Sequence, residues 1–140
     1  MTQNSGEATI GLSGTTATAL WAGRVMTGLF VLFMLFDVGI KLMRLPIVDD
    51  AMIQLGYPPG LGFAIGVLEA VLLALYLIPR TAILGAVLFT GVFGGAIASH
   101  MRIGDPLFSH VLFGVYLGGF AWGGLWFRDA SLRALLPVRR

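Results

Sequence analysis

Residues 26–41 read MTGLFVLFMLFDVGIK, an apolar run that ends with an acid and a base one helical turn apart. The run lies within a hydrophobic segment at 20–43, and about 20 such residues are enough for a helix to cross the hydrocarbon core of a bilayer. An ionisable side chain at membrane depth costs roughly 2.5–3.5 kcal/mol on insertion scales. The stretch therefore predicts a transmembrane helix in which Asp37 and Lys41 need partners.

The composition of the whole chain supports a membrane protein. Of its 140 residues, 57% are hydrophobic and 11% are charged, and the mean hydropathy is +0.90. A soluble domain has about 25% charged residues, so this chain has too few charges to cover a globule. The net charge of +2 comes from basic residues at segment ends, which argues against a nucleic-acid partner. The absence of cysteine excludes disulfides and thiolate-bound metals.

Four hydrophobic segments separated by polar, proline or glycine residues predict an all-α fold. We expect an integral membrane four-helix bundle with spans at 20–43, 61–78, 82–101 and 107–127. The second and third spans must be antiparallel neighbours because Pro79 and Arg80 leave only a short connection between them. Apolar residues at helical spacing predict a short interfacial helix over 47–55. The expected organisation is a flexible tail at 1–18, a transmembrane domain at 19–128 and a basic tail at 129–140.

Small residues recur at every fourth position on three of these segments. Such spacing lets helix backbones approach closely in lipid, so we expect these residues to pack inside the bundle, with a homodimer face as the alternative. The stripes begin with the pairs Gly62 and Gly66, Gly91 and Gly95, and Gly114 and Gly118.

The distribution of Lys and Arg predicts the orientation. The positive-inside rule assigns the side with more basic residues to the cytoplasm, and that side carries both termini. The basic residues expected there are Arg24, Arg80, Arg128, Arg133, Arg139 and Arg140, against Lys41, Arg44 and Arg102 on the other side.

The ionisable residues of the hydrophobic region gather in the membrane half opposite the arginine-rich side. Asp37 and Lys41 are at i and i+4, a favourable order on one helix face. Glu69 has no partner within its own helix, so it is either protonated or paired with Lys41, Arg102 or a histidine. The candidate polar cluster consists of Asp37, Lys41, Glu69, His100, Arg102, Asp105 and His110.

Several functions are compatible with such a cluster. Glu69 and a histidine suit a proton relay beside a lipid-soluble quinone, whereas histidines with carboxylates suit zinc or iron, although no HExxH-like spacing supports a metal. A small-solute carrier and a structural or assembly protein, in which the charges only hold helices together, are further alternatives. No phosphate loop or nucleophile elbow is present.

Several short motifs follow one another in a specific order and spacing: Gly39-Ile40-Lys41-Leu42, Leu55-Gly56-Tyr57-Pro58, Glu69 and Ala96-Ile97-Ala98-Ser99-His100 followed by Gly104-Asp105-Pro106. In these motifs the chain resembles the DoxX-like family of small bacterial four-helix membrane proteins. Asp37 occupies a place where that family more often has a small or polar residue. The resemblance implies a protein of the bacterial inner membrane. It also implies an accessory role in redox or quinone chemistry, with a membrane redox partner protein. A homo-oligomer remains the alternative that the stripes of small residues leave open.

Overall fold

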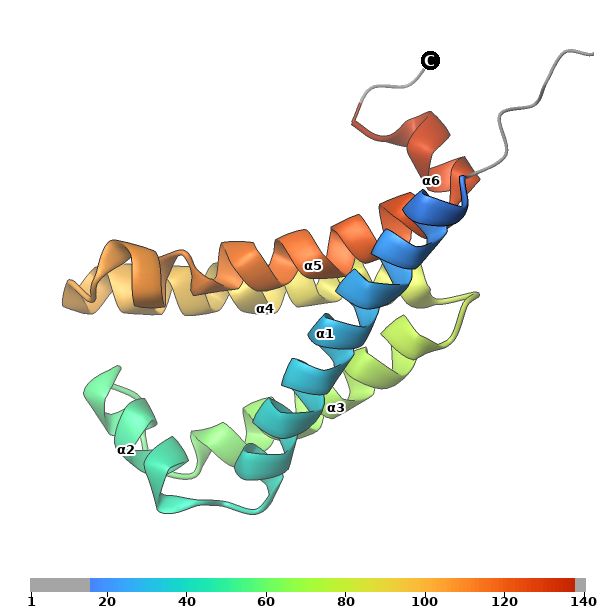
Figure 1. Ribbon diagram of the computed structural model, residues 1–140. Coiled ribbons are helices and arrows are strands. Elements are labelled where there is room, and N and C mark those ends of the chain that lie inside the picture. Colours follow the sequence, from blue (N-terminus) through green and yellow to red (C-terminus); the bar gives the residue numbers. More distant parts are fainter. Residues whose placement is uncertain (1–15, 138–140) are drawn as a thin grey trace, which may run out of the picture.

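The computed structural model describes residues 16–137, and this part of the chain is helical without a strand. The all-α expectation is therefore confirmed. The helices are shown in Figure 1. They are α1 (Ala17–Leu42), α2 (Pro46–Gln54), α3 (Leu61–Leu77), α4 (Ala82–Ile103), the π-helix η1 (Leu107–Val111), α5 (Phe113–Arg128) and α6 (Ala130–Leu135).

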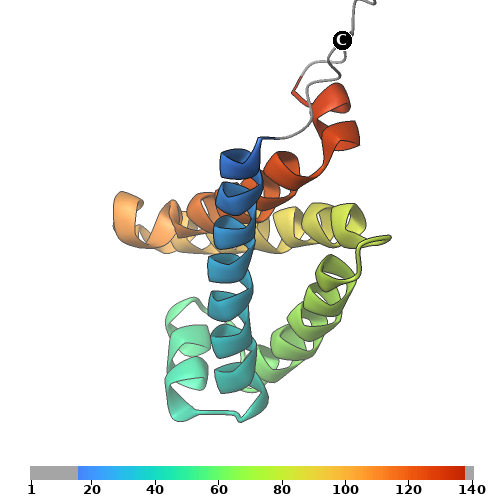
Figure 2. The ribbon, with the colours of Figure 1, turned by 45° about the vertical axis from the view of Figure 1, so that its right-hand side comes forward.

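The four long helices form a ring of neighbours, since α1 and α4 each pack against both α3 and α5. Figures 1 and 2 show that the start of α1, the α3–α4 turn and the end of α5 lie together at one end of the molecule. We call this the inner end. At the opposite, outer end, α2 packs against α3 and η1 packs against α4 and α5.

Three stretches are long and apolar enough to cross a membrane: Ala17–Leu42, Ala82–Ile103 and Leu107–Arg128. Helix α3 has 17 residues, which gives a length of about 25 Å, shorter than a hydrocarbon core of roughly 30 Å. Four packed helices are thus present, but by length only three are candidate spans, and the fourth span stays a prediction. Large apolar side chains such as Leu32 and Phe36 are exposed on the outside of the ring, as lipid contact requires.

Two helix ends differ from the expected boundaries because of capping side chains. Helix α1 begins at Ala17 rather than residue 20, since the Thr16 side chain accepts the N–H of Ala19 at 3.3 Å. The expected tail at 1–18 otherwise lies outside the described residues. Helix α6 was not anticipated within 129–140. Asp129 caps it by accepting the N–H of Ser131, and hydrogen bonding from the Ser131 side chain is the main cause that lowers the pKa of Asp129.

Aromatic rings fill the centre and inner half of the bundle. The Phe30 ring meets the edges of Tyr76 and Phe89 at centroid distances of 4.9 and 5.3 Å. The Tyr76 hydroxyl donates to the Ala121 carbonyl at 2.8 Å. A Cβ at Gly85 would lie 2.6 Å from the Tyr76 backbone nitrogen. The glycine therefore allows α3 and α4 to touch almost backbone to backbone.

The glycine stripes are used unequally. A Cβ at Gly66 would lie 2.7 Å from Lys41 Cβ, and one at Gly114 would lie 3.1 Å from the Phe93 carbonyl oxygen, so these glycines pack inside the bundle as predicted. Gly91 and Gly95 on α4 would place a Cβ in open space. The prediction of close helix packing is wrong at these two glycines, because no neighbouring atom lies within 4 Å of a Cβ there, whereas Ser99, the next residue of the stripe, is buried.

Candidate functional site

The Lys41 ammonium lies between two carboxylates from different helices. Its Nζ is 2.5 Å from Asp37 Oδ2, one turn earlier on α1, and 2.7 Å from Glu69 Oε2 on α3. The contact across the helices is possible because Gly66, one turn before Glu69, brings the α3 backbone against the Lys41 stem. We call Asp37, Lys41 and Glu69 the Lys41 trio.

The trio is withdrawn from the surface of the molecule. The exposed fractions of the side chains are 22% for Asp37, 14% for Lys41 and 5% for Glu69. Glu69 is therefore the most deeply buried of the three side chains, and it is the acid that has no partner within its own helix. Of the three partners considered for it, the structure selects Lys41.

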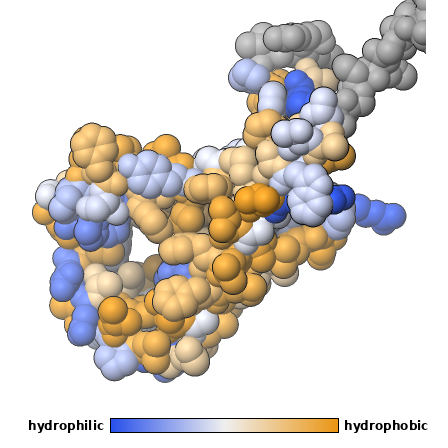
Figure 3. All heavy atoms as spheres, viewed as in Figure 1, coloured by the Kyte–Doolittle hydropathy of each residue, from blue (hydrophilic) through white to orange (hydrophobic). Residues whose placement is uncertain are grey.

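A two-lobed hollow lies on both sides of the trio. The first lobe, of about 140 Å³, lies between α1, α4, η1 and α5. The second lobe, of about 420 Å³, lies between α2, α3 and α4. Figure 3 shows the hollow as an opening between the helices, with hydrophilic residues inside it and on its rim. The two lobes share the lining residues Lys41, Glu69, Val92, Ala96 and His100.

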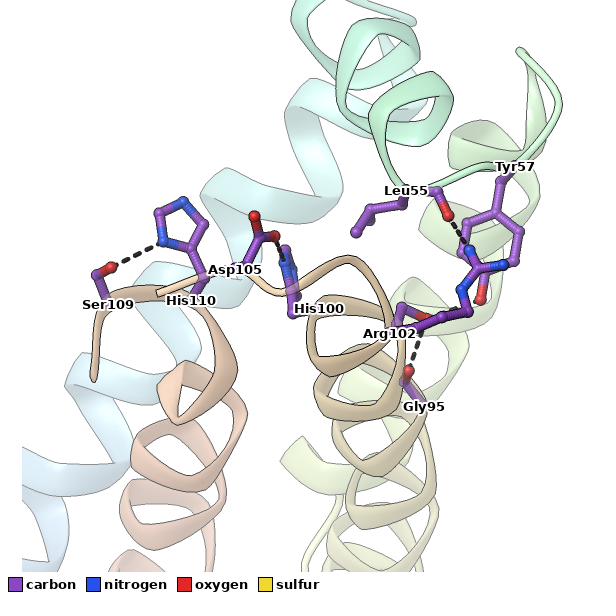
Figure 4. Close-up of polar contacts among 9 residues, drawn as sticks. Leu55, Tyr57, Gly95, His100, Arg102, Asp105, Ser109 and His110 are labelled. Atoms are coloured by element: carbon purple, nitrogen blue, oxygen red, sulfur yellow. Dashed lines mark hydrogen bonds and ion pairs between the residues drawn. The ribbon is translucent and has the colours of Figure 1, made fainter. Parts of the chain in front are cut away.

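Two histidines line the first lobe at its outer end. His100 Nδ1, in the last turn of α4, lies 2.5 Å from Asp105 Oδ2, in the turn that follows Gly104. His110 lies in η1 with its ring edge toward His100, at a centroid distance of 5.7 Å, and its Nδ1 lies 2.8 Å from Ser109 Oγ (Figure 4). A π-helical turn at this point fits the frequent occurrence of such turns at functional sites.

Arg102 is directed away from the Lys41 trio. Its guanidinium donates to the Leu55 carbonyl and lies over the Tyr57 ring at 5.7 Å (Figure 4). The Tyr57 hydroxyl also lies 2.7 Å from Ser99 Oγ. These contacts fasten the connection between α2 and α3 to the outer end of α4, beside the second lobe.

The predicted cluster is thus divided by the structure. The Lys41 trio and both histidines line the hollow, Asp105 holds His100, and Arg102 belongs to a separate contact. Within residues 16–137, no group of three or more His, Asp or Glu side chains is arranged to hold a metal ion.

Sequence reasoning missed the aromatic wall of the first lobe. Phe33 lies one turn before Asp37 on α1, and Phe93 and Phe113 enter from α4 and α5. The spacing of Phe33 and Asp37 is a signal that the two share a helix face. Phe93 and Phe113 give no such signal, since a phenylalanine in an apolar helix is equally compatible with lipid.

The arrangement places an ammonium group, two imidazoles, carboxylate acceptors and aromatic rings around one partly open space. It is suited to binding a small amphipathic molecule and to holding a proton beside it. In comparison with known proteins, the model of the DoxX-like family matches residues 25–124 of the chain, which include every residue of the predicted cluster. No curated protein and no solved structure gives a significant match.

Proposed function

The chain belongs to the DoxX-like family, and we propose that it is an accessory membrane subunit that binds a quinone in the hollow. Family membership and the long apolar helices make it an integral membrane protein. The observation that carries the finer proposal is the hollow itself, where hydrogen-bond donors face an aromatic wall inside the bundle.

The residues present fit a quinone headgroup. Such a headgroup is a flat apolar ring with carbonyl acceptors at opposite ends. Lys41 Nζ is a donor on the wall of the first lobe, the His100 imidazole lies beside it, and the Phe33 and Phe113 rings, 5.1 Å apart, offer apolar contact. The second lobe is larger and lined by apolar α3 residues such as Ile65, which suits an isoprenoid tail.

The proposed role is accessory because the sequence carries no cofactor motif that would supply electrons. A membrane redox partner protein exchanges electrons with the quinone, and this chain binds and orients the headgroup. The Glu69 carboxyl and the imidazoles are placed to hold or release the protons that accompany electron transfer.

The quinone proposal is tested with the protein purified in a mild detergent. We expect quinone to co-purify with the wild type, and a short-chain analogue such as decylubiquinone to bind saturably. Glu69→Gln removes the charge that positions Lys41 and should weaken this binding about tenfold or more. Asp50→Asn, the same charge change on the exposed face of α2, is the matched control. Wild-type protein that neither carries nor binds quinone would reject the proposal.

We further propose that α3 crosses the membrane as well, which gives four spans with both termini in the cytoplasm of a bacterium. Slight thinning of the bilayer accommodates a helix of 17 residues. Arg24, Arg80 and Arg128 then lie at the inner end, on the side that basic residues favour. Because the chain lacks cysteine, single cysteines at Arg80 and at Asp50 report sidedness. An impermeant thiol reagent added to intact cells should label the second and spare the first.

A structural or assembly role is the second candidate. It is favoured by the pairing of Lys41 with acids on both α1 and α3, which by itself holds two helices together. If the role is structural, the Glu69→Gln variant should lose stability, and neither it nor the wild type should bind quinone. A small-solute carrier, the third candidate, would show flux of a solute in reconstituted vesicles.

A further inference from the structure

The charges that line the hollow do not balance. Asp37 and Glu69 contribute two negative charges, and Lys41 contributes one positive charge. The His100 ring is engaged by Asp105 and the His110 ring by Ser109. The parts of α2 and α5 that line the hollow carry no charge. With all three groups ionised, the Lys41 trio carries a net charge of −1.

The two carboxylates share one basic partner. Lys41 Nζ contacts both Asp37 Oδ2 and Glu69 Oε2, and the two carboxyl groups also act on each other. The Glu69 side chain is 5% exposed and lines both lobes. An uncompensated negative charge at such a position is costly, and either a proton on a carboxylate or a further positive charge in the hollow removes that cost.

The walls around these carboxylates suit an organic cation. Phe33, Phe93 and Phe113 line the first lobe together with the thioether of Met34. The faces of aromatic rings attract a cation within about 6 Å of the ring centroid. A small metal ion would need more oxygen or nitrogen ligands than are gathered here. An ammonium group with apolar substituents, in contrast, uses the carboxylates and the rings together.

We propose that the hollow binds a lipophilic organic cation, a quaternary or protonated amine whose apolar substituents lie against the phenylalanine wall. The positive centre lies beside the carboxylates of Asp37 and Glu69 and balances the charge of the Lys41 trio. This goes beyond quinone binding, because a neutral quinone leaves the net charge of the wall unchanged. A proton on either carboxylate competes with the cation for the same charge.

The test uses benzyltrimethylammonium and its neutral carbon isostere, neopentylbenzene, titrated into the detergent-solubilised protein at pH 8 by calorimetry, with empty micelles as the blank. We expect saturable binding of the cation and none of the isostere. Glu69→Gln and Asp37→Asn should each weaken cation binding at least about tenfold. Asp50→Asn should leave it unchanged, and lowering the pH to 5 should weaken it as protons occupy the carboxylates.

A second variant keeps the test decisive if Glu69→Gln does not fold. Phe113→Leu leaves every charge in place and removes one ring, and it should weaken cation binding about threefold. Equal affinity for the cation and its isostere, or equal affinity in the wild type and both carboxylate variants, would overturn the proposal. Failure of decylubiquinone to bind would reject the quinone proposal alone, whereas competition between quinone and cation would show that they share the hollow.

Discussion

The inner and outer halves of the bundle are built by the same four helices and differ in what fills the space between them. Toward the inner end, Phe30, Tyr76 and Phe89 meet ring to ring, and Gly85 brings two backbones together. Toward the outer end, the α4–α5 pair diverges from α1 and α3 (Figure 1). There the space holds an ion cluster and a hollow.

The difference in packing between the two halves suggests that the inner half stabilises the bundle and that the outer half is the place for a binding site. Between helices in lipid, close van der Waals contact replaces the hydrophobic drive, so the packed half has to hold the ring together. The hollow half gives up that contact, and its helices are joined by Lys41 and by the contacts of Arg102 and Tyr57. A binding site is expected in the half that is less tightly packed and more polar.

The largest expected loss comes from the packed half. Phe89 is fully buried, and Phe89→Ala should lower the free energy of unfolding by about 3–5 kcal/mol, because it leaves a cavity where rings from three helices meet. The measurement is unfolding by sodium dodecyl sulfate in bicelles. Phe36→Ala, at a lipid-facing position on α1, is the control and should change stability much less. Similar losses for both variants would mean that the inner half is not the stabilising core.

The next largest effect concerns the Lys41 trio. Lys41→Met leaves two carboxylates without a cation and should cost about 3 kcal/mol. The double variant Asp37→Asn, Lys41→Met should recover little, because Glu69 remains unpaired. The triple variant that adds Glu69→Gln should recover most of the loss. Full recovery in the double variant would show that Glu69 is not part of the cluster.

A smaller effect distinguishes two glycines on α4. Gly85→Ala forces a Cβ into the Tyr76 backbone and should cost about 2 kcal/mol through overpacking. Gly91→Ala adds a Cβ in open space and should change stability by no more than about 0.5 kcal/mol. The same unfolding assay compares them. A large loss at Gly91 with wild-type behaviour at Gly85 would reverse the assignment of faces on this helix.

The smallest effect is expected at the rim of the hollow. Ser99→Ala removes the hydroxyl that meets the Tyr57 hydroxyl and should cost about 1 kcal/mol. The control is Thr18→Ala, which removes a hydroxyl at an exposed position in the first turn of α1 and should cost less. An unchanged stability for Ser99→Ala would show that the connection between α2 and α3 is not fastened through this contact.

The sequence was sufficient for the parts of the fold that depend on local pattern. Hydrophobic segment length predicts the four helices, and the i, i+4 spacing predicts the contact of Asp37 with Lys41. The gathering of polar residues at one end follows from antiparallel connections of short length.

The sequence was insufficient where helix rotation decides. A stripe of glycines predicts close packing but not whether a neighbouring helix fills the space beside it, so the packing expected at Gly91 and Gly95 was wrong. Glu69 pairs with Lys41 and not with Arg102, and this pairing depends on the rotation of α3 and α4 about their axes. The aromatic wall was missed for the same reason, because a phenylalanine that faces lipid and one that faces a hollow look alike in an apolar segment.

The most direct test of the hollow as a binding site is to fill it. Ala96 on α4 lines both lobes, so Ala96→Phe should abolish binding of decylubiquinone and of benzyltrimethylammonium while the free energy of unfolding stays near that of the wild type. Binding is measured by calorimetry on the folded variant, with Ala98→Phe on the exposed face of the same helix as the control. Wild-type affinities in Ala96→Phe would contradict the account.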